Sequence, residues 1–189
     1  MKILVLDNYD SFTYNLVHIL KELTKGDVDV FRNDEISLQE IERYDKILIS
    51  PGPGLPDQAG ITKEMIATYA PTKSIFGVCL GCQAIGEVFE GSLINLDTVY
   101  HGVETKIIVL DKSELLFTDI PGTFTAGRYH SWVVNRKGLS PEMIITAADE
   151  EGNVMALTHK SYDVRGVQFH PESIMTKHGK QILQNWLNI

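Results

Sequence analysis

The chain has few cysteines, no surplus of positive charge and no long apolar run. Two cysteines among 189 residues cannot make a disulfide framework, which favours a reducing compartment. With 17 basic against 25 acidic residues the formal charge is −8, so neither a nucleic acid nor an anionic membrane is an expected partner. No stretch reaches the ~18 apolar residues of a membrane span, and the apolar run at residues 2–6 is too short for a signal peptide. We expect a cytoplasmic protein.

The remaining composition is typical of a globular protein. Hydrophobic residues make up 43% and charged residues 22% of the chain, which excludes a disordered or fibrous protein. At roughly 150 residues per domain, the length predicts one domain over residues 1–189. A domain of this size buries roughly 70% of the surface of its unfolded chain, so it needs neither a disulfide nor a metal for stability.

The first half of the chain alternates apolar runs with amphipathic segments. The runs predict strands and the segments predict helices: strands at residues 2–7, 28–31, 46–50 and 74–78, and helices at residues 12–23, after Ser37 and at residues 60–69. Ser11 is placed to cap the first helix, and Ser37 with Glu40 forms a capping-box pattern. Strands separated by helices pair in parallel through right-handed crossovers, with helices on both faces of the sheet.

The second half of the chain shows strand patterns joined by short turns, at residues 105–110, 123–126, 143–147, 154–159 and 164–170. A final amphipathic helix is predicted at residues 177–187. We therefore predict a single-domain, doubly wound α/β fold with helices on both faces. Its sheet is mostly parallel, and the C-terminal half adds antiparallel strands.

Cys79 stands where the fourth predicted strand meets a helix, within Gly-Val-Cys-Leu-Gly at residues 77–81. A glycine two residues either side of a nucleophile at such a junction is typical of a nucleophile elbow. The N-terminus of the following helix would stabilise a thiolate, and the Leu80 N–H could face an oxyanion. Cys79 and Cys82 also fit a thioredoxin-like redox pair, half of a zinc site, or two buried structural thiols.

Residues 166–172, Gly-Val-Gln-Phe-His-Pro-Glu, favour the nucleophile over those alternatives. A strand delivers His170, Pro171 stops that strand, and Glu172 turns back towards the same region. A cysteine nucleophile needs a base, and the base needs an acceptor for its other ring nitrogen. His170 and Glu172 supply these two groups in one short segment.

Two loops are candidates for a substrate pocket. Residues 50–54, Ser-Pro-Gly-Pro-Gly, follow a parallel strand at the edge where such sheets bind ligands, and the glycines leave backbone N–H groups accessible. Residues 129–132, Tyr-His-Ser-Trp, pair polar groups with an aromatic wall, as the pocket of a small polar substrate does. The other histidines are interpreted as surface groups: His18, His101, His159 and His178.

Together these motifs resemble the class I, triad-type glutamine amidotransferases, from about residue 2 to the C-terminus. Residues 7–16, Asp-Asn-Tyr-Asp-Ser-Phe-Thr-Tyr-Asn-Leu, are similar to the opening of the glutaminase subunits that serve anthranilate synthase and aminodeoxychorismate synthase. The resemblance implies a subunit that hydrolyses L-glutamine and delivers ammonia to a separate chorismate-binding synthase subunit. The first choice for that partner is the large subunit of anthranilate synthase. The alternative is that the chain serves aminodeoxychorismate synthase, or that it is shared by both synthases.

The resemblance also assigns roles by matching position. Cys79 would be the nucleophile, His170 the base and Glu172 its orienting partner, while Gly54 and Leu80 would offer oxyanion N–H groups. The positions that match those holding glutamine are Gly52, Pro53, Gly54, Gln83, Ser131 and Trp132. No cofactor or metal is implied for this chain, and the synthase partner would need Mg²⁺.

Cys82 stands where most relatives carry histidine, which keeps a redox role open. The chain could be a thiol-disulfide oxidoreductase that uses Cys79 and Cys82, or the same two cysteines could form an inhibitory disulfide in an active glutaminase. A pseudoenzyme that only binds is a third hypothesis, disfavoured because no triad position is lost.

Overall fold

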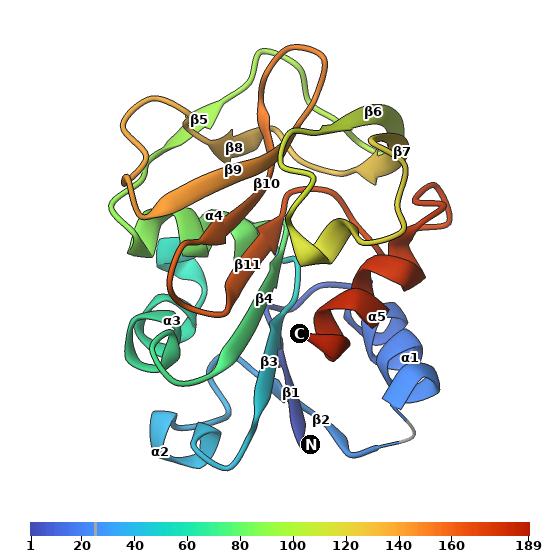
Figure 1. Ribbon diagram of the computed structural model, residues 1–189. Helices are drawn as coiled ribbons and strands as arrows, with labels where there is room; N and C mark the ends of the chain where they lie inside the picture. The colour runs from blue at the N-terminus through green and yellow to red at the C-terminus, as the bar shows by residue number, and fades with distance from the viewer. Residues whose placement is uncertain (25) are drawn as a thin grey trace.

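A nine-stranded sheet runs through the molecule, and its two halves pair differently (Figure 1). The computed structural model describes residues 1–24 and 26–189. The parallel half consists of β2 (Val28–Arg32), β1 (Ile3–Asp7), β3 (Lys46–Ile49), β4 (Ser74–Val78) and β11 (Val164–Val167), in that spatial order. The antiparallel half continues from β11 with β10 (Val154–His159), β9 (Met143–Ala148), β6 (Val103–Val109) and β7 (Thr123–Arg128). The predicted doubly wound α/β fold with antiparallel additions is confirmed.

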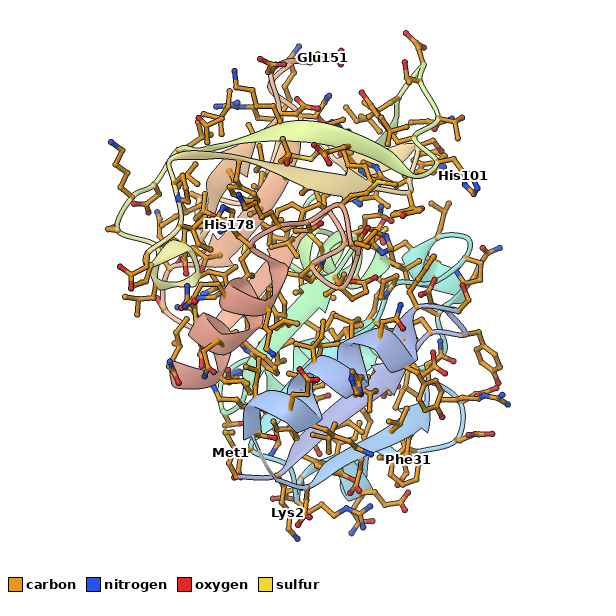
Figure 2. The ribbon with its side chains drawn as sticks, turned by 90° about the vertical axis from the view of Figure 1, so that its right-hand side faces the viewer. Met1, Lys2, Phe31, His101, Glu151 and His178 are labelled. Atoms are coloured by element: carbon orange, nitrogen blue, oxygen red, sulfur yellow. The ribbon has the colours of Figure 1, made fainter. Side chains whose placement is uncertain are left out.

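Helices cover both faces of the parallel half, as predicted. On one face lie α1 (Thr13–Thr24) and α5 (Gly179–Asn188), which Figure 2 shows side by side in front of the sheet. On the other face lie α3 (Thr62–Tyr69) and α4 (Leu80–Val88) (Figure 1). The short helix α2 (Leu38–Ile41) begins with the predicted capping box.

Three short elements complete the fold. Two are 3₁₀ turns, η1 (Pro56–Gln58) and η2 (Leu115–Phe117). The third is a separate two-stranded sheet of β5 (Leu93–Asn95) and β8 (Trp132–Val134), which the sequence analysis did not predict. Strands of three residues are too short to give an alternating pattern, and this pairing joins segments far apart in the sequence.

The structure differs from the prediction at the start of α1 and at the end of β11. At the start of α1 it is Asp10, rather than Ser11, whose carboxylate accepts the backbone N–H of Phe12, at 2.7 Å. Strand β11 ends at Val167 instead of reaching His170. Beyond Val167 the backbone no longer pairs with β4. The His170 N–H donates instead to the Gly127 carbonyl on β7, at 3.0 Å.

The register of β4 with β11 brings two distant segments of the chain to the same edge of the sheet. Val78 lies opposite Val167, so residue 79 and residues 168–172 leave adjacent parallel strands at their carboxyl ends. The Cys79 N–H then donates to the Val167 carbonyl at 2.8 Å, which fixes the first residue beyond β4 against β11.

Gly81 allows α4 to approach β3, and we predict that Gly81→Ala destabilises the protein. A Cβ at this position would lie 2.8 Å from the Ile49 carbonyl oxygen, inside van der Waals contact with backbone that cannot move aside. The expected loss is about 1–3 kcal/mol in the free energy of unfolding, measured by urea denaturation. The control is Gly122→Ala, since a Cβ there would meet no atom within 4 Å. Equal midpoints for the two variants would contradict the prediction.

Candidate active site

Cys79 occupies the turn between β4 and α4 in a backbone conformation that few side chains adopt. Its φ is 52° and its ψ is −101°, so the structure has the sharp turn that the flanking glycines predict. A non-glycine residue at positive φ costs on the order of 1–3 kcal/mol, and such strain persists only where surrounding contacts enforce it. Here the strained conformation is enforced by the hydrogen bond from the Cys79 N–H to the Val167 carbonyl and by the start of α4 at the next residue.

His170 and Glu172 form a buried pair. The His170 Nδ1–H donates to Glu172 Oε1 at 2.6 Å, and both side chains are almost fully enclosed. The edge of the imidazole also meets the Tyr129 ring, with centroids 4.8 Å apart, and the Phe12 ring lies 6.1 Å away. The other ring nitrogen, Nε2, is buried and has no hydrogen-bond partner.

The Cys79 sulfur and the Glu172 carboxylate keep His170 protonated. Burial by itself would lower the pKa of His170, because it penalises the charged imidazolium. The contact with Cys79, followed by that with Glu172, outweighs burial and raises the pKa of His170 to about 10. In neutral solution the His170 side chain is therefore an imidazolium.

A cavity of about 310 Å³ opens on Cys79. Its size and its mixture of apolar walls with a few polar groups suit a small polar ligand. Its lining contains Cys79 and six residues predicted for the substrate, together with three more: Gly52, Pro53, Gly54, Gln83, Ser131 and Trp132, with Leu55, Tyr129 and His130. The structure thus brings the two candidate loops together on one side of the predicted nucleophile.

Of the two residues predicted to offer N–H groups to an oxyanion, Gly54 lines the cavity, whereas Leu80 is buried and is not among the lining residues. Leu80 is the first residue of α4, where N–H groups lack partners within the helix. Gly54 lies on the cavity wall with a φ of +73°, which favours glycine. The Leu55 N–H next to it donates to Gln58 Oε1 at 3.2 Å, which holds this end of the loop in place.

The N-terminal motif supports the loop at residues 50–54. Asn8 N–H donates to Ser50 Oγ at 2.8 Å, and Asn8 Nδ2 donates to the Ser50 carbonyl at 3.0 Å. Asn33 and Thr62 in turn donate to Asn8 Oδ1, at 2.8 and 2.9 Å. These side chains are buried and their bonds satisfied, so the loop carrying Gly52 and Gly54 is anchored by a polar network rather than by packing alone.

His130 forms a wall of the cavity as a neutral group. Its Nδ1–H donates to the Trp132 carbonyl at 3.0 Å, while its Nε2 accepts from Arg128 Nε at 3.1 Å. Burial, and then the charge of Arg128, lowers the pKa of His130 to about 3. Arg128 is itself paired with Asp149 at 2.8 Å in the interior. No sequence pattern indicated this ion pair, because its two members are distant in the chain and neither belongs to a motif.

Gln168 is a second site residue that the sequence analysis passed over. Its Nε2 lies 3.5 Å from Cys79 Sγ, and its side chain is completely buried. The available signal was its place within residues 166–172, two positions before His170.

The surroundings of Cys82 argue against a thiol-disulfide oxidoreductase. Both cysteines are free, and the Cys82 side chain is fully buried between α4 and β11, against Gly166. Burial, and then the charge of Cys79, raises the pKa of the Cys82 thiol well above its ordinary value. Thiol-disulfide exchange needs a thiolate that a partner disulfide can reach, and Cys82 meets neither condition.

The other histidines differ in their exposure. His18 is exposed beside Glu22, and Figure 2 shows His101 projecting from the molecule, so both are the surface groups predicted. The prediction is wrong for His159, which is buried with its ring stacked on Tyr162, centroids 4.3 Å apart. His178 is partly buried, with its ring edge on Phe124.

Residues 1–24 and 26–189 contain neither a cluster of metal ligands nor a helix that could span a membrane. Among these residues no three His, Cys, Asp or Glu side chains gather closely enough to hold a metal ion. None of their helices has the length and apolar character needed to cross a membrane.

Comparisons with known proteins give similar sequences over the whole chain. The family model for class-I glutamine amidotransferases matches residues 4–189. The aminodeoxychorismate/anthranilate synthase component 2 of Bacillus subtilis is 46% identical over 187 residues, covering 98% of this chain and 95% of that protein. The anthranilate synthase component 2 of Porphyra purpurea is 44% identical over 189 residues, with 98% of each chain covered.

Two more comparisons concern length and fold. The bifunctional protein TrpGD of Thermotoga maritima is 43% identical over all of this chain, which spans only 32% of that protein's length. The crystal structure of a glutamine amidotransferase from Thermotoga maritima superposes with a TM-score of 0.85, covering 100% of this chain and 96% of that one. At 12% identity, this second likeness concerns the fold alone. The family match over nearly the full length and the similar sequences place this chain in the class-I glutamine amidotransferase family.

Proposed function

We propose that this chain is the glutaminase subunit of an anthranilate synthase, hydrolysing L-glutamine and delivering ammonia to a chorismate-binding subunit. The observation that carries the proposal is Cys79 at a strained turn, with the His170–Glu172 pair beside it and a polar cavity at the sulfur. The choice of synthase is supported by the relatives from Bacillus subtilis and Porphyra purpurea, whose names include anthranilate synthase component 2.

Glutamine would enter the cavity with its side-chain amide towards Cys79. Ser131 and Trp132 on one wall and residues 52–54 on the other offer polar backbone groups for the amino and carboxylate ends. The amide oxygen would then face the N–H groups of Gly54 and Leu80. Such fixed donors stabilise the negative charge that develops on this oxygen, in a site from which much of the water is excluded.

The first half of the reaction would form a thioester. The Cys79 thiolate attacks the side-chain amide carbon, and the electron pair of the C=O bond moves onto the oxygen. His170 gives its Nε2 proton to the amide nitrogen, the C–N bond breaks and ammonia leaves. Protonation of the leaving nitrogen requires an imidazolium, which is the form that the raised pKa of His170 provides.

The second half would hydrolyse the thioester. Neutral His170 takes a proton from water at Nε2, and the resulting hydroxide attacks the thioester carbon. The C–S bond breaks, glutamate leaves, and the thiolate and imidazolium are restored. Glu172 accepts the Nδ1–H in both halves, so the same ring nitrogen faces the reaction throughout.

Ammonia has to leave the site without meeting bulk water, because protonation to ammonium removes its nucleophilic electron pair. A partner docked at the carboxyl edge of the sheet would shelter the exit. Ile174 supports a contact there, since it lies two residues beyond Glu172 and its side chain is 99% exposed. We infer that the chorismate-binding subunit docks over this edge.

Three further parts of the proposal follow from the same chemistry. Hydrolysis would use only side chains and water, so no cofactor is assigned to this chain, whereas the chorismate-binding subunit would require Mg²⁺. A cytoplasmic location fits two unpaired cysteines. A second candidate is the glutaminase subunit of aminodeoxychorismate synthase, or a subunit shared by both, which the printed name of the Bacillus subtilis relative favours.

The proposal predicts glutamine-dependent anthranilate formation when this chain is mixed with a separate anthranilate synthase large subunit. Anthranilate fluorescence is recorded with chorismate and either glutamine or ammonium as the nitrogen donor. Cys79→Ala should reduce the glutamine-dependent rate by at least about 1,000-fold, because no thioester can form, and should leave the ammonium-dependent rate unchanged. Cys82→Ala is the matched control and should keep the glutamine-dependent signal.

Three outcomes would change the conclusion. A glutamine-dependent signal that persists in Cys79→Ala would refute the nucleophile. Loss of that signal in Cys82→Ala, with folding intact, would revive a role for the second thiol. If the anthranilate synthase large subunit is active with ammonium but gives no glutamine-dependent signal with this chain, the alternative partner is favoured. The experiment is then repeated with an aminodeoxychorismate synthase large subunit.

The protonation state of His170 can be tested by NMR. In protein with ¹⁵N-labelled histidine we expect His170 to be an imidazolium at about pH 8, since its pKa is raised to about 10. His130 should be neutral in the same spectrum, because its pKa is lowered to about 3. In Cys79→Ala the pKa of His170 should fall, because the largest raising contact is lost. A neutral His170 at about pH 8 in the unaltered chain would contradict the proton-donor role.

A further inference from the structure

Gln168 contacts the Cys79 sulfur directly through its side-chain amide. It is the residue after β11, its side chain has no exposed surface, and its Nε2 lies 3.5 Å from Cys79 Sγ. The Gln168 backbone N–H donates to the Met155 carbonyl at 2.9 Å, which ties this residue to β10. The amide is therefore presented by the sheet and not by a loose loop.

Gln83 determines which end of the Gln168 amide faces the sulfur. Gln83 Nε2 donates to Gln168 Oε1 at 3.3 Å, so the oxygen of that amide is occupied and its NH₂ group points to Cys79. The same Gln83 nitrogen donates to the Trp132 carbonyl at 2.8 Å. The Trp132 carbonyl, the Gln83 side chain and the Gln168 amide thus form one chain of hydrogen bonds that ends on the Cys79 sulfur.

We infer that Gln168 is a further catalytic residue, whose amide N–H donates to the Cys79 thiolate. The inference rests on the glutaminase activity proposed above. A buried thiolate needs donors, because burial penalises its charge. A carboxamide is a neutral donor that keeps both protons whether or not His170 has given one away.

The donor matters at two points of the reaction. Before the attack it holds the thiolate at a fixed position beside the cavity. In the second half, the C–S electron pair returns to sulfur as glutamate leaves, and the Gln168 N–H then stabilises the negative charge that forms. No proton moves in this contact, so Gln168 is unchanged at the end of the cycle.

In addition to the Gln168 amide, which does not titrate, two titratable side chains act on the Cys79 sulfur. His170 lies on the segment that follows β11, and Cys82 lies one turn along α4. Both remain in place when Gln168 is replaced by a side chain of similar size, so a change in the pH dependence of Cys79 reports the lost donor.

The test is the rate of Cys79 alkylation by iodoacetamide as a function of pH, with the site of modification checked by mass spectrometry. Gln168→Met keeps the length of the side chain and removes the donor. We expect the pH of half-maximal rate to rise by about one unit, which makes alkylation about tenfold slower at any pH below both midpoints. Gln83→Met keeps the Gln168 donor but removes the hydrogen bonds from Gln83 to Gln168 Oε1 and to the Trp132 carbonyl, and it should cause a smaller shift in the same direction.

Thr158→Val is the matched structural control. Thr158 is buried on β10, and its hydroxyl donates to the Val164 carbonyl at 3.3 Å, so the variant loses a hydrogen bond next to β11 without touching the sulfur. A merely structural role for Gln168 predicts lower thermal stability with an unchanged pH profile, as expected for Thr158→Val. With the synthase partner present, Gln168→Met should lower kcat for glutamine about tenfold and change KM by less than about twofold.

Superposable pH profiles of Gln168→Met, Gln83→Met and the unaltered chain would overturn the inference. Gln83→Met keeps the test decisive if Gln168→Met does not fold. Alkylation involves neither glutamine nor the partner. A shifted profile without glutaminase activity would therefore count against the proposed function and not against the contact.

Discussion

The parallel pairing of β11 with β4 is the interaction on which the site depends. It places Val78 opposite Val167, so the two strands end at the same edge and deliver Cys79 and Gln168 as neighbours. The hydrogen bond from Cys79 N–H to the Val167 carbonyl then helps to hold the nucleophile in its strained turn. Glycines make this junction possible, because Gly81 lets the first turn of α4 pass close to the β3 backbone. Without this register, the chain would carry the same side chains without a common site.

Two buried histidines near the sulfur are driven to opposite protonation states by their neighbours. His170 faces a carboxylate and the thiol, which raise its pKa, whereas His130 faces an arginine, which together with burial lowers its pKa. The charged ring is then the one paired with Glu172, and the neutral ring lines the cavity and donates to the Trp132 carbonyl. A pair of titratable groups whose pKa values are pushed apart is a common way of separating an acid from a structural group.

The polar networks around the cavity explain motifs that have no reactive atom. Asn8, Asn33 and Thr62 hold the loop after β3, while Gln83 ties α4 to β8 and to Gln168. A chain of satisfied buried hydrogen bonds fixes geometry more narrowly than apolar packing, because each donor has one direction. Substrate contacts made by backbone N–H groups need such support, since no side-chain rotamer positions them.

The sequence by itself determined the alternation of strands and helices, the elbow at Cys79, and the pairing of His170 with Glu172, because each is written in residues close together in the chain. It also indicated both walls of the cavity through residues 50–54 and 129–132. Only the tertiary structure decided the contacts that join distant segments: the β5–β8 sheet, the buried Arg128–Asp149 pair, and the Gln168 amide on the sulfur. It also decided the surroundings of Cys82, which local spacing made a candidate redox partner and which the fold buries completely against β11. Periodicity and motifs report neighbours within a turn or a strand, whereas burial and pKa depend on what the rest of the fold places alongside.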